Sequence, residues 1–108
     1  MANDITGNRW VFDGAMTAAQ RKELLGLHTI IAFFWTESSS RDIAADDNLV
    51  MKDSTGKEIY VDTAAGTPAT ASNKAGVVIG YPGLQVNGFD LEALDGGVLI
   101  VWLAIPYT

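Results

Sequence analysis

The chain contains no cysteine, and this absence removes several kinds of chemistry at once. Disulfide bridges, thiolate metal sites and cysteine nucleophiles are all excluded. Histidine is nearly absent as well, because His28 is the sole one, so a common zinc site has no second histidine to draw on. No serine and acid are spaced around His28 in a recognisable catalytic motif. Because His28 begins an apolar segment, we expect it to have a structural role.

Positive charge is also scarce. The chain has 7 Lys and Arg residues against 13 Asp and Glu residues, which gives a formal net charge of −6. The basic residues are scattered, and only Arg21 and Lys22 adjoin. Binding to a phosphate backbone needs clustered Lys and Arg that displace counterions. We therefore expect no nucleic-acid partner.

Long hydrophobic runs are missing. Apolar stretches such as Ile30–Trp35 fall far short of the roughly 20 residues that cross a bilayer as a helix. The first residues, Met1–Ile5, contain neither a basic region nor an apolar run, so they do not resemble a signal peptide. These features predict no membrane partner and synthesis in a cytoplasm.

What remains is a short chain that is rich in apolar side chains. Hydrophobic residues make up 48% of its 108 residues, with three Trp, three Tyr and four Phe. This composition argues against disorder and suits one hydrophobic core. We expect a single domain that covers residues 1–108.

Short segments rich in β-branched and aromatic residues alternate with turn signals, which predicts a mainly all-β fold. The fold class that fits is a small antiparallel β-sandwich or barrel of about seven short strands. Asp53–Lys57 is predicted to be a hairpin turn in which Gly56 adopts a positive φ. The expected strands are 9–12, 28–36, 49–53, 58–62, 77–79, 84–86 and 98–104.

Residues 17–25 leave two interpretations open. Thr17 and Gln20 match a capping box, and Gly26 stands where a left-handed helix cap would fall, so a helix of two turns is one interpretation. The alternative is that Leu24 and Leu25 lead directly into the next strand, because short helices are weak without packing. The segments 63–76 and 87–97 are expected to be loops.

The hairpin strands are predicted to be apolar on one face only. Leu49 and Met51 share a face in the first strand, and Ile59 and Val61 share one in the second. The segments 30–35 and 98–104 differ, because both of their faces are apolar.

A two-layer sandwich buries only one face of each sheet, so the second face of these segments needs cover. We expect this cover to come from another molecule, with the segments at 17–25, 37–48 and 63–76 as the intramolecular alternative. Aromatic anchors are typical of such interfaces. The interface candidates are Ile31, Phe33, Trp35, Leu99, Val101, Leu103 and Trp102.

Several acidic and aromatic groups are candidates for chemical sites. Asp42, Asp46 and Asp47 lack the spacing and closing Glu of a calcium loop, so solvated loop charge is the preferred interpretation. The acids Asp90, Glu92 and Asp95 are likewise interpreted as surface charge, with a glycosidase-type carboxylate pair as the alternative. The three tryptophans suit a core or an interface better than a sugar-binding face. We therefore expect no metal, no cofactor, no small-molecule substrate and no catalytic residue.

Five segments share a pattern with a known family, namely 5–13, 49–53, 56–60, 82–86 and 94–103. In their order, they resemble small virion-associated proteins of tailed bacteriophages that are encoded near the major capsid gene. These segments cover roughly half of the chain, and the segments 17–26 and 63–76 depart from the pattern. The resemblance implies a non-enzymatic β-sandwich on or within the virion, first as a head decoration or cement protein and second as a tail or connector component.

The sequence and this resemblance therefore predict a structural protein that is located in the virion, on the capsid surface, and is assembled in the host cytoplasm. Its expected partners are copies of itself, the major capsid protein, or both. A carbohydrate-binding module that uses exposed tryptophans and a small carboxylate enzyme are the rival hypotheses.

Overall fold

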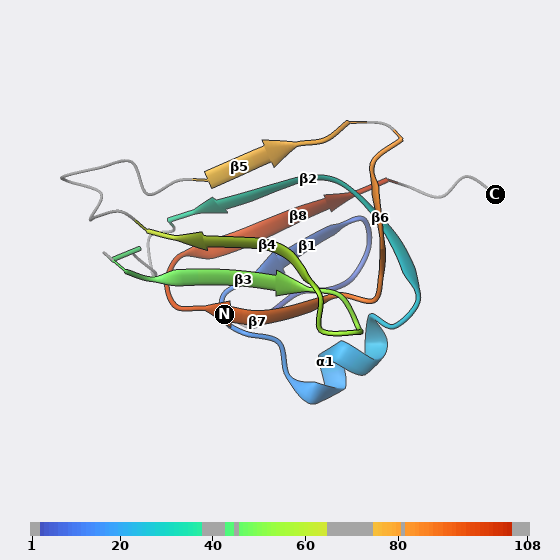
Figure 1. The fold of residues 1–108 in the computed structure, drawn as a ribbon, viewed down its shortest axis with the longest axis horizontal. Helices are drawn as coiled ribbons and strands as arrows, with labels where there is room; N and C mark the ends of the chain where they lie inside the picture. The colour runs from blue at the N-terminus through green and yellow to red at the C-terminus, as the bar shows by residue number, and fades with distance from the viewer. Residues whose placement is uncertain (1–2, 38–42, 45, 65–74, 81, 105–108) are drawn as a thin grey trace.

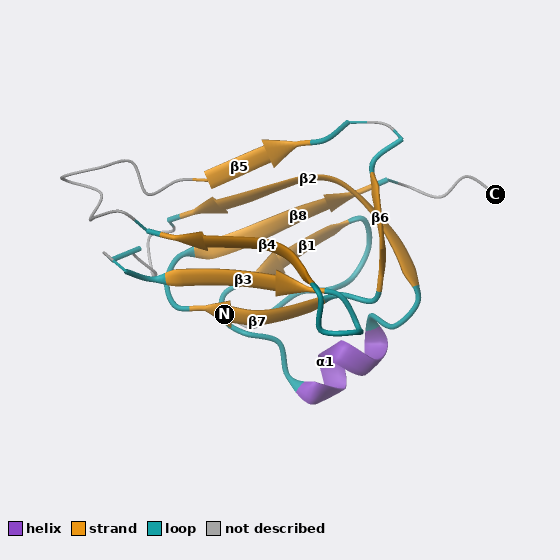
Figure 2. Ribbon diagram, viewed as in Figure 1, coloured by secondary structure: helices purple, strands orange, loops and turns teal. Residues whose placement is uncertain are grey.

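The computed structural model describes residues 3–37, 43–44, 46–64, 75–80 and 82–104, which form two antiparallel sheets and one short helix (Figures 1 and 2). The larger sheet contains β1 (Arg9–Phe12), β8 (Val98–Leu103), β2 (Leu27–Thr36), β5 (Ala75–Val78) and β6 (Leu84–Asn87). The smaller sheet contains β4 (Glu58–Thr63), β3 (Asn48–Lys52) and β7 (Asp90–Leu94). The expected mainly β sandwich is confirmed, and the described strands do not close into a barrel.

Strand β2 organises the larger sheet. One of its edges pairs with β8, and the other pairs first with β6 and then with β5. The register against β8 shifts between Ile30 and Ala32. The predicted strands at 77–79 and 84–86 both form, but each pairs with β2 rather than with the other. Residue 81, which lies between them in the sequence, is outside the described part of the chain.

The core lies between the two sheets. Trp10 and Phe12 share the inner face of β1, as the alternation predicts. Across the sandwich, Leu49 and Met51 of β3 are fully buried, which confirms their predicted face. The other fully buried large side chains are Ile30, Trp35, Ile43, Phe89, Leu91, Leu99 and Val101.

Helix α1 (Ala18–Glu23) confirms the helical interpretation of residues 17–25. The Gln20 backbone N–H donates to Thr17 Oγ1 over 3.2 Å, and the Thr17 backbone N–H donates to Gln20 Oε1 over 3.1 Å. These bonds satisfy N–H groups that the first turn would leave unpaired. No helix residue is buried, and α1 lies at one end of the sandwich (Figure 1), away from the outer side of the larger sheet.

Two expectations about the smaller sheet are wrong. Residues 87–97 were expected to form a loop, but Asp90–Leu94 is strand β7 and pairs with β3. Val61 was expected to be buried, yet it is 47% exposed, and Tyr60 packs against the core instead. The reason is a register shift between Met51 and Lys52, which turns the following residues of β4 over.

The turns and loops behave partly as the sequence predicts. In the hairpin turn, the Asp53 N–H donates to the Lys57 carbonyl over 2.9 Å, and Gly56 has a φ of +85°. This confirms the turn. Of the predicted loop at 63–76, residues 65–74 lie outside the described part of the chain, whereas Thr63 ends β4 and Ala75 begins β5.

Candidate functional site

The predicted interface residues do not share one surface. Five of them are buried inside the protein, so the expectation that their face points outward is wrong. Ile31 is half-buried, and Trp102 alone among the seven is classed as exposed, at 37%. Strand alternation predicted two apolar faces correctly, but it contained no information about which one meets the smaller sheet. The five buried candidates are Phe33, Trp35, Leu99, Val101 and Leu103.

The opposite side of the larger sheet is the apolar surface. Strand pairing places Val11, Ile100 and Phe34 in one row across the sheet. A second row runs from Arg9 through Trp102 and Ala32 to Val78. We call the apolar members of both rows the outer apolar face: Val11, Ala32, Phe34, Val78, Ile100 and Trp102.

Three members of the outer apolar face are well exposed. Phe34 is 38% exposed, Trp102 is 37% exposed and Val78 is 74% exposed. The guanidinium of Arg9 lies over the Trp102 ring, with its carbon 5.5 Å from the ring centroid. This cation–π contact covers part of the indole and leaves the remainder open. Large apolar side chains gathered on one sheet face are typical of interaction surfaces.

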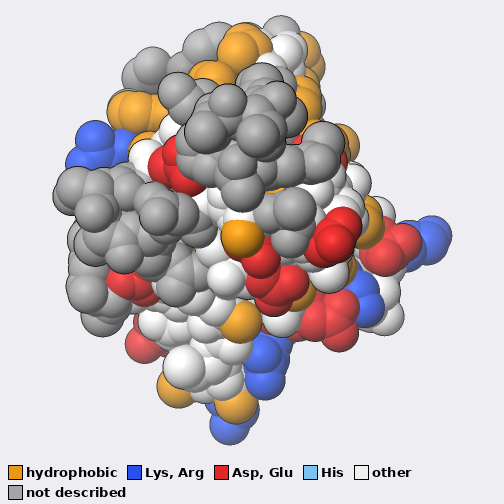
Figure 3. Space-filling view, turned by 90° about the vertical axis from the view of Figure 1, so that its left-hand side faces the viewer, with side chains coloured by type: hydrophobic (Ala, Val, Ile, Leu, Met, Phe, Trp, Pro, Cys, Tyr) orange, Lys and Arg blue, Asp and Glu red, His pale blue; other side chains and the backbone are white. Residues whose placement is uncertain are grey.

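Acidic side chains gather at the end of the sandwich where β2 ends and β3 begins, and Figure 3 shows them as red patches on that end. Asp42 lies outside the described residues, and Asp46 adopts a φ of +68°. Asp47 Oδ2 accepts from the Ala44 N–H over 2.8 Å. Among the described residues, no group of His, Cys, Asp or Glu side chains is arranged to hold a metal ion. The Asp47 carboxylate therefore stabilises its own loop.

The acids of the β7 region are engaged with other groups rather than with one another. Asp90 lies 3.6 Å from Arg21, and Glu92 lies 2.7 Å from the Lys52 ammonium. The hydrogen bond from Lys52 to Glu92 raises the pKa of Lys52. Asp95 Oδ2 accepts from the Asn48 N–H over 2.9 Å. This arrangement does not resemble the facing carboxylates of a glycosidase.

The three tryptophans lie in different surroundings. Trp35 is 1% exposed, and its indole N–H donates to the Gly96 carbonyl over 2.9 Å. Trp10 is 3% exposed, so only Trp102 presents a substantial ring surface. The sugar-binding face that was considered for all three therefore does not form.

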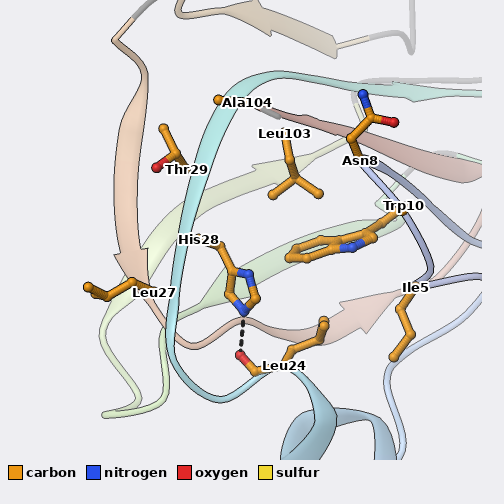
Figure 4. Close-up of a pocket in the computed structure, with 10 residues that line it drawn as sticks. Ile5, Asn8, Trp10, Leu24, Leu27, His28, Thr29, Leu103 and Ala104 are labelled. Carbon is orange, nitrogen blue, oxygen red and sulfur yellow. Dashed lines mark hydrogen bonds between the residues drawn. The ribbon is translucent and has the colours of Figure 1, made fainter. Parts of the chain in front are cut away.

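A cleft of about 690 Å³ opens beside α1, at the end of the sandwich where β8 finishes (Figure 4). Aliphatic side chains of Ile5, Leu24, Leu27 and Leu103 line it, together with the rings of Trp10 and His28. The two rings meet edge to face, with centroids 5.0 Å apart. His28 Nε2 donates to the Leu24 carbonyl over 2.8 Å, which fits the expected structural role. This cleft could not be predicted from local sequence patterns, because its lining residues come from separate segments between positions 5 and 104.

No helix in the described part of the chain is long and apolar enough to cross a membrane. Comparisons with protein-family models, with curated proteins and with solved structures find no match to the chain. The features that bear on function are therefore the outer apolar face, the acidic end of the sandwich where β2 ends and β3 begins, and the cleft.

Proposed function

We propose that the chain is a non-enzymatic structural protein that associates with copies of itself through the outer apolar face. The observation that carries this proposal is the exposure of Phe34, Trp102 and Val78 on one side of the larger sheet. The inner side of the same sheet already packs against the smaller sheet. The described part of the chain leaves these side chains exposed, and a second molecule would cover them.

The charge of the protein favours an apolar contact. Each copy carries a formal charge of −6, so two copies repel one another at long range. Among the residues that form the two rows of the outer face, Arg9 alone is charged, and it lies at the rim beside Trp102. The free energy gained by burying apolar surface does not depend on these charges. A two-fold contact would pair the same patch on both copies.

We further propose a virion as the setting, with the chain as a capsid decoration or cement protein. The sequence resemblance to phage virion proteins supports this setting, and a tail or connector component is the alternative within it. A stable isolated interface buries about 800 Å² per partner. On a particle, several modest contacts per copy add up through multivalency. A cement protein that bridges capsid subunits needs only modest contacts of this kind.

Sedimentation velocity over a range of protein concentrations tests self-association. We expect the unmodified protein to form dimers or larger species, and V78D to remain monomeric because it places a charge in the contact. V61D is the matched control, because Val61 is also an exposed strand valine but lies on the smaller sheet. Since Val78 is 74% exposed, V78D should fold, and circular dichroism would check this. A wild-type protein that stays monomeric, or a V78D variant that associates like wild type, would refute the proposal.

Co-sedimentation with empty phage capsids tests the setting. We expect the wild-type protein to pellet with capsids of its own phage, and V78D to pellet at least tenfold less because its contacts with neighbouring copies are lost. Self-association without capsid binding would refute the capsid role and leave the structural role standing.

A further inference from the structure

The cleft beside α1 is separate from the outer apolar face. Its walls come from the segment before β1, from β1 itself, from the start of β2 and from the end of β8. Figure 4 shows the Trp10 indole crossing the cleft, with His28 at one end of the ring and Ile5 near the other. None of the described residues that line the cleft is Asp, Glu, Lys or Arg.

Trp10 has a hydrogen-bond donor without an acceptor. Trp10 is only 3% exposed, yet no described residue accepts a hydrogen bond from its indole N–H. Buried tryptophans usually find such a partner, as Trp35 does with Gly96. Because Trp10 lines the cleft, a molecule bound there could supply the missing acceptor.

His28 supplies an acceptor in the same place. The Leu24 carbonyl can only accept, so the hydrogen of the neutral imidazole resides on Nε2, which donates to it. Nδ1 is then a free acceptor, since it has no hydrogen-bond partner among the described residues. The His28 and Trp10 rings are in contact, with centroids 5.0 Å apart, so the acceptor and the donor belong to neighbouring side chains that both line the cleft.

We propose that the cleft binds a neutral, mainly apolar small molecule through an amide group. The amide oxygen would accept from Trp10 Nε1, and the amide N–H would donate to His28 Nδ1. The aliphatic walls would cover the apolar part of the molecule, and the absence of charged lining residues disfavours an ion, which would lose its hydration without a counter-charge. The volume of about 690 Å³ falls within the range of ligand sites. The sequence predicted no small-molecule substrate, and this proposal adds a ligand rather than a reaction.

The indole N–H signals of ¹⁵N-labelled protein test this site directly. Trp10, Trp35 and Trp102 each give one signal, and W102F identifies the last of them. We expect benzamide to shift the Trp10 signal and to leave those of Trp35 and Trp102 in place. N,N-dimethylbenzamide lacks the N–H donor and benzoate is charged, so each should bind at least about tenfold more weakly than benzamide.

Three variants distinguish specific binding in the cleft from non-specific hydrophobic binding. L27D places a charge at the rim of the cleft and should weaken benzamide binding about tenfold or more. L25D is its matched control, because Leu25 and Leu27 are 62% and 65% exposed and Leu25 does not line this cleft. H28F should reduce benzamide binding to the level of N,N-dimethylbenzamide and leave the binding of N,N-dimethylbenzamide unchanged.

Several results would overturn the proposal. They are a Trp10 signal that benzamide does not move, equal shifts of all three indole signals, equal binding of benzamide and benzoate, or equal effects of L27D and L25D. A Trp10 signal that moves with protein concentration alone would identify a second copy, not a small molecule, as the occupant. V78D should bind benzamide normally and L27D should self-associate normally, so this proposal and the structural role fail independently.

Discussion

The ring of Phe33 meets the ring of Tyr60 edge to face, with centroids 4.8 Å apart and planes inclined by 62°. Phe33 belongs to β2 of the larger sheet and Tyr60 to β4 of the smaller sheet, so this pair joins the two layers. The Tyr60 hydroxyl donates to Asp62 Oδ2 over 3.2 Å, which helps to orient the ring. The register shift in β4 is what brings Tyr60 to this position.

Replacing Tyr60 tests how much the ring contributes to joining the sheets. Y60A should lower the free energy of unfolding by about 2–4 kcal/mol, since it removes a large packed side chain and an edge-to-face pair. Y60F keeps the ring and loses only the bond to Asp62, so its effect should stay below about 1 kcal/mol. Urea denaturation followed by tryptophan fluorescence measures both values. Similar losses in the two variants would show that the hydroxyl, not the ring, is the important group.

Gly97 and Gly7 allow the effect of steric crowding around an added Cβ to be compared at two similar backbone conformations. Their φ values are +70° and +73°, so alanine is strained at both positions by about 1 kcal/mol. A Cβ at Gly97 would lie 2.6 Å from Ile43 Cγ1 and 2.7 Å from the Thr36 carbonyl oxygen, whereas a Cβ at Gly7 meets nothing within 4 Å. We expect G97A to cost about 2–4 kcal/mol and G7A about 1 kcal/mol. Thermal unfolding of the two variants should differ clearly, and equal melting temperatures would contradict the crowded geometry.

Thr17 caps the one helix of the described chain. T17A removes the acceptor for the Gln20 N–H and should lower the free energy of unfolding by about 1 kcal/mol. T17S retains the hydroxyl and should behave like the wild type. Because no helix residue is buried, the loss should also appear locally, as faster hydrogen exchange at Gln20. Normal exchange at Gln20 in T17A would show that the capping box does not hold the helix start.

The hairpin turn should weaken in acid. Asp53 Oδ1 accepts from the Thr55 hydroxyl and the Thr55 and Lys57 backbone N–H groups over 2.6, 2.9 and 3.0 Å. The Thr55 hydroxyl, the largest cause, and these N–H groups lower the pKa of Asp53 below its ordinary value of 3.8.

The sign of the pH effect follows from this lowered pKa. The carboxylate form is favoured in the folded state, so its contribution is complete above the unfolded pKa and is lost as the pH falls through the lower, folded pKa. The stability gap between wild type and D53A should therefore shrink as the pH falls below 3.8. Urea titrations from pH 6 to pH 2 measure this gap, and T55V should move the folded pKa of Asp53 back toward 3.8. A gap that is constant over the whole range would contradict the role of the charge.

Local chemistry was enough to predict several elements. The β-branched and aromatic run at 28–36 gave β2, Asp53–Lys57 gave the turn, and Thr17 with Gln20 gave the helix start. Each of these features is decided by residues that are neighbours in sequence. That is why the sequence was informative about them.

The incorrect predictions share a different cause, which is strand pairing between residues that are far apart in the sequence. Asp90–Leu94 has a composition that is poor in strand-forming residues, and it becomes a strand because β3 pairs with it and Lys52 holds Glu92. The register shifts after Ile30 and Met51 decide which side chains turn inward, and neither shift has a local signature. The cleft and the outer apolar face depend on the same pairings, so the sequence could suggest an apolar surface but not place it.

The pairing of β2 also sets an order of events during synthesis. Strands β1 and β2 pair with β5, β6 and β8, and 38 residues lie between Thr36 at the end of β2 and Ala75 at the start of β5. Until those later residues leave the ribosome, β1 and β2 lack their partners in the nascent chain, and β2 is apolar on both faces. This interval is when the protein is most open to aggregation, and a chaperone that shields extended apolar segments would have its effect then.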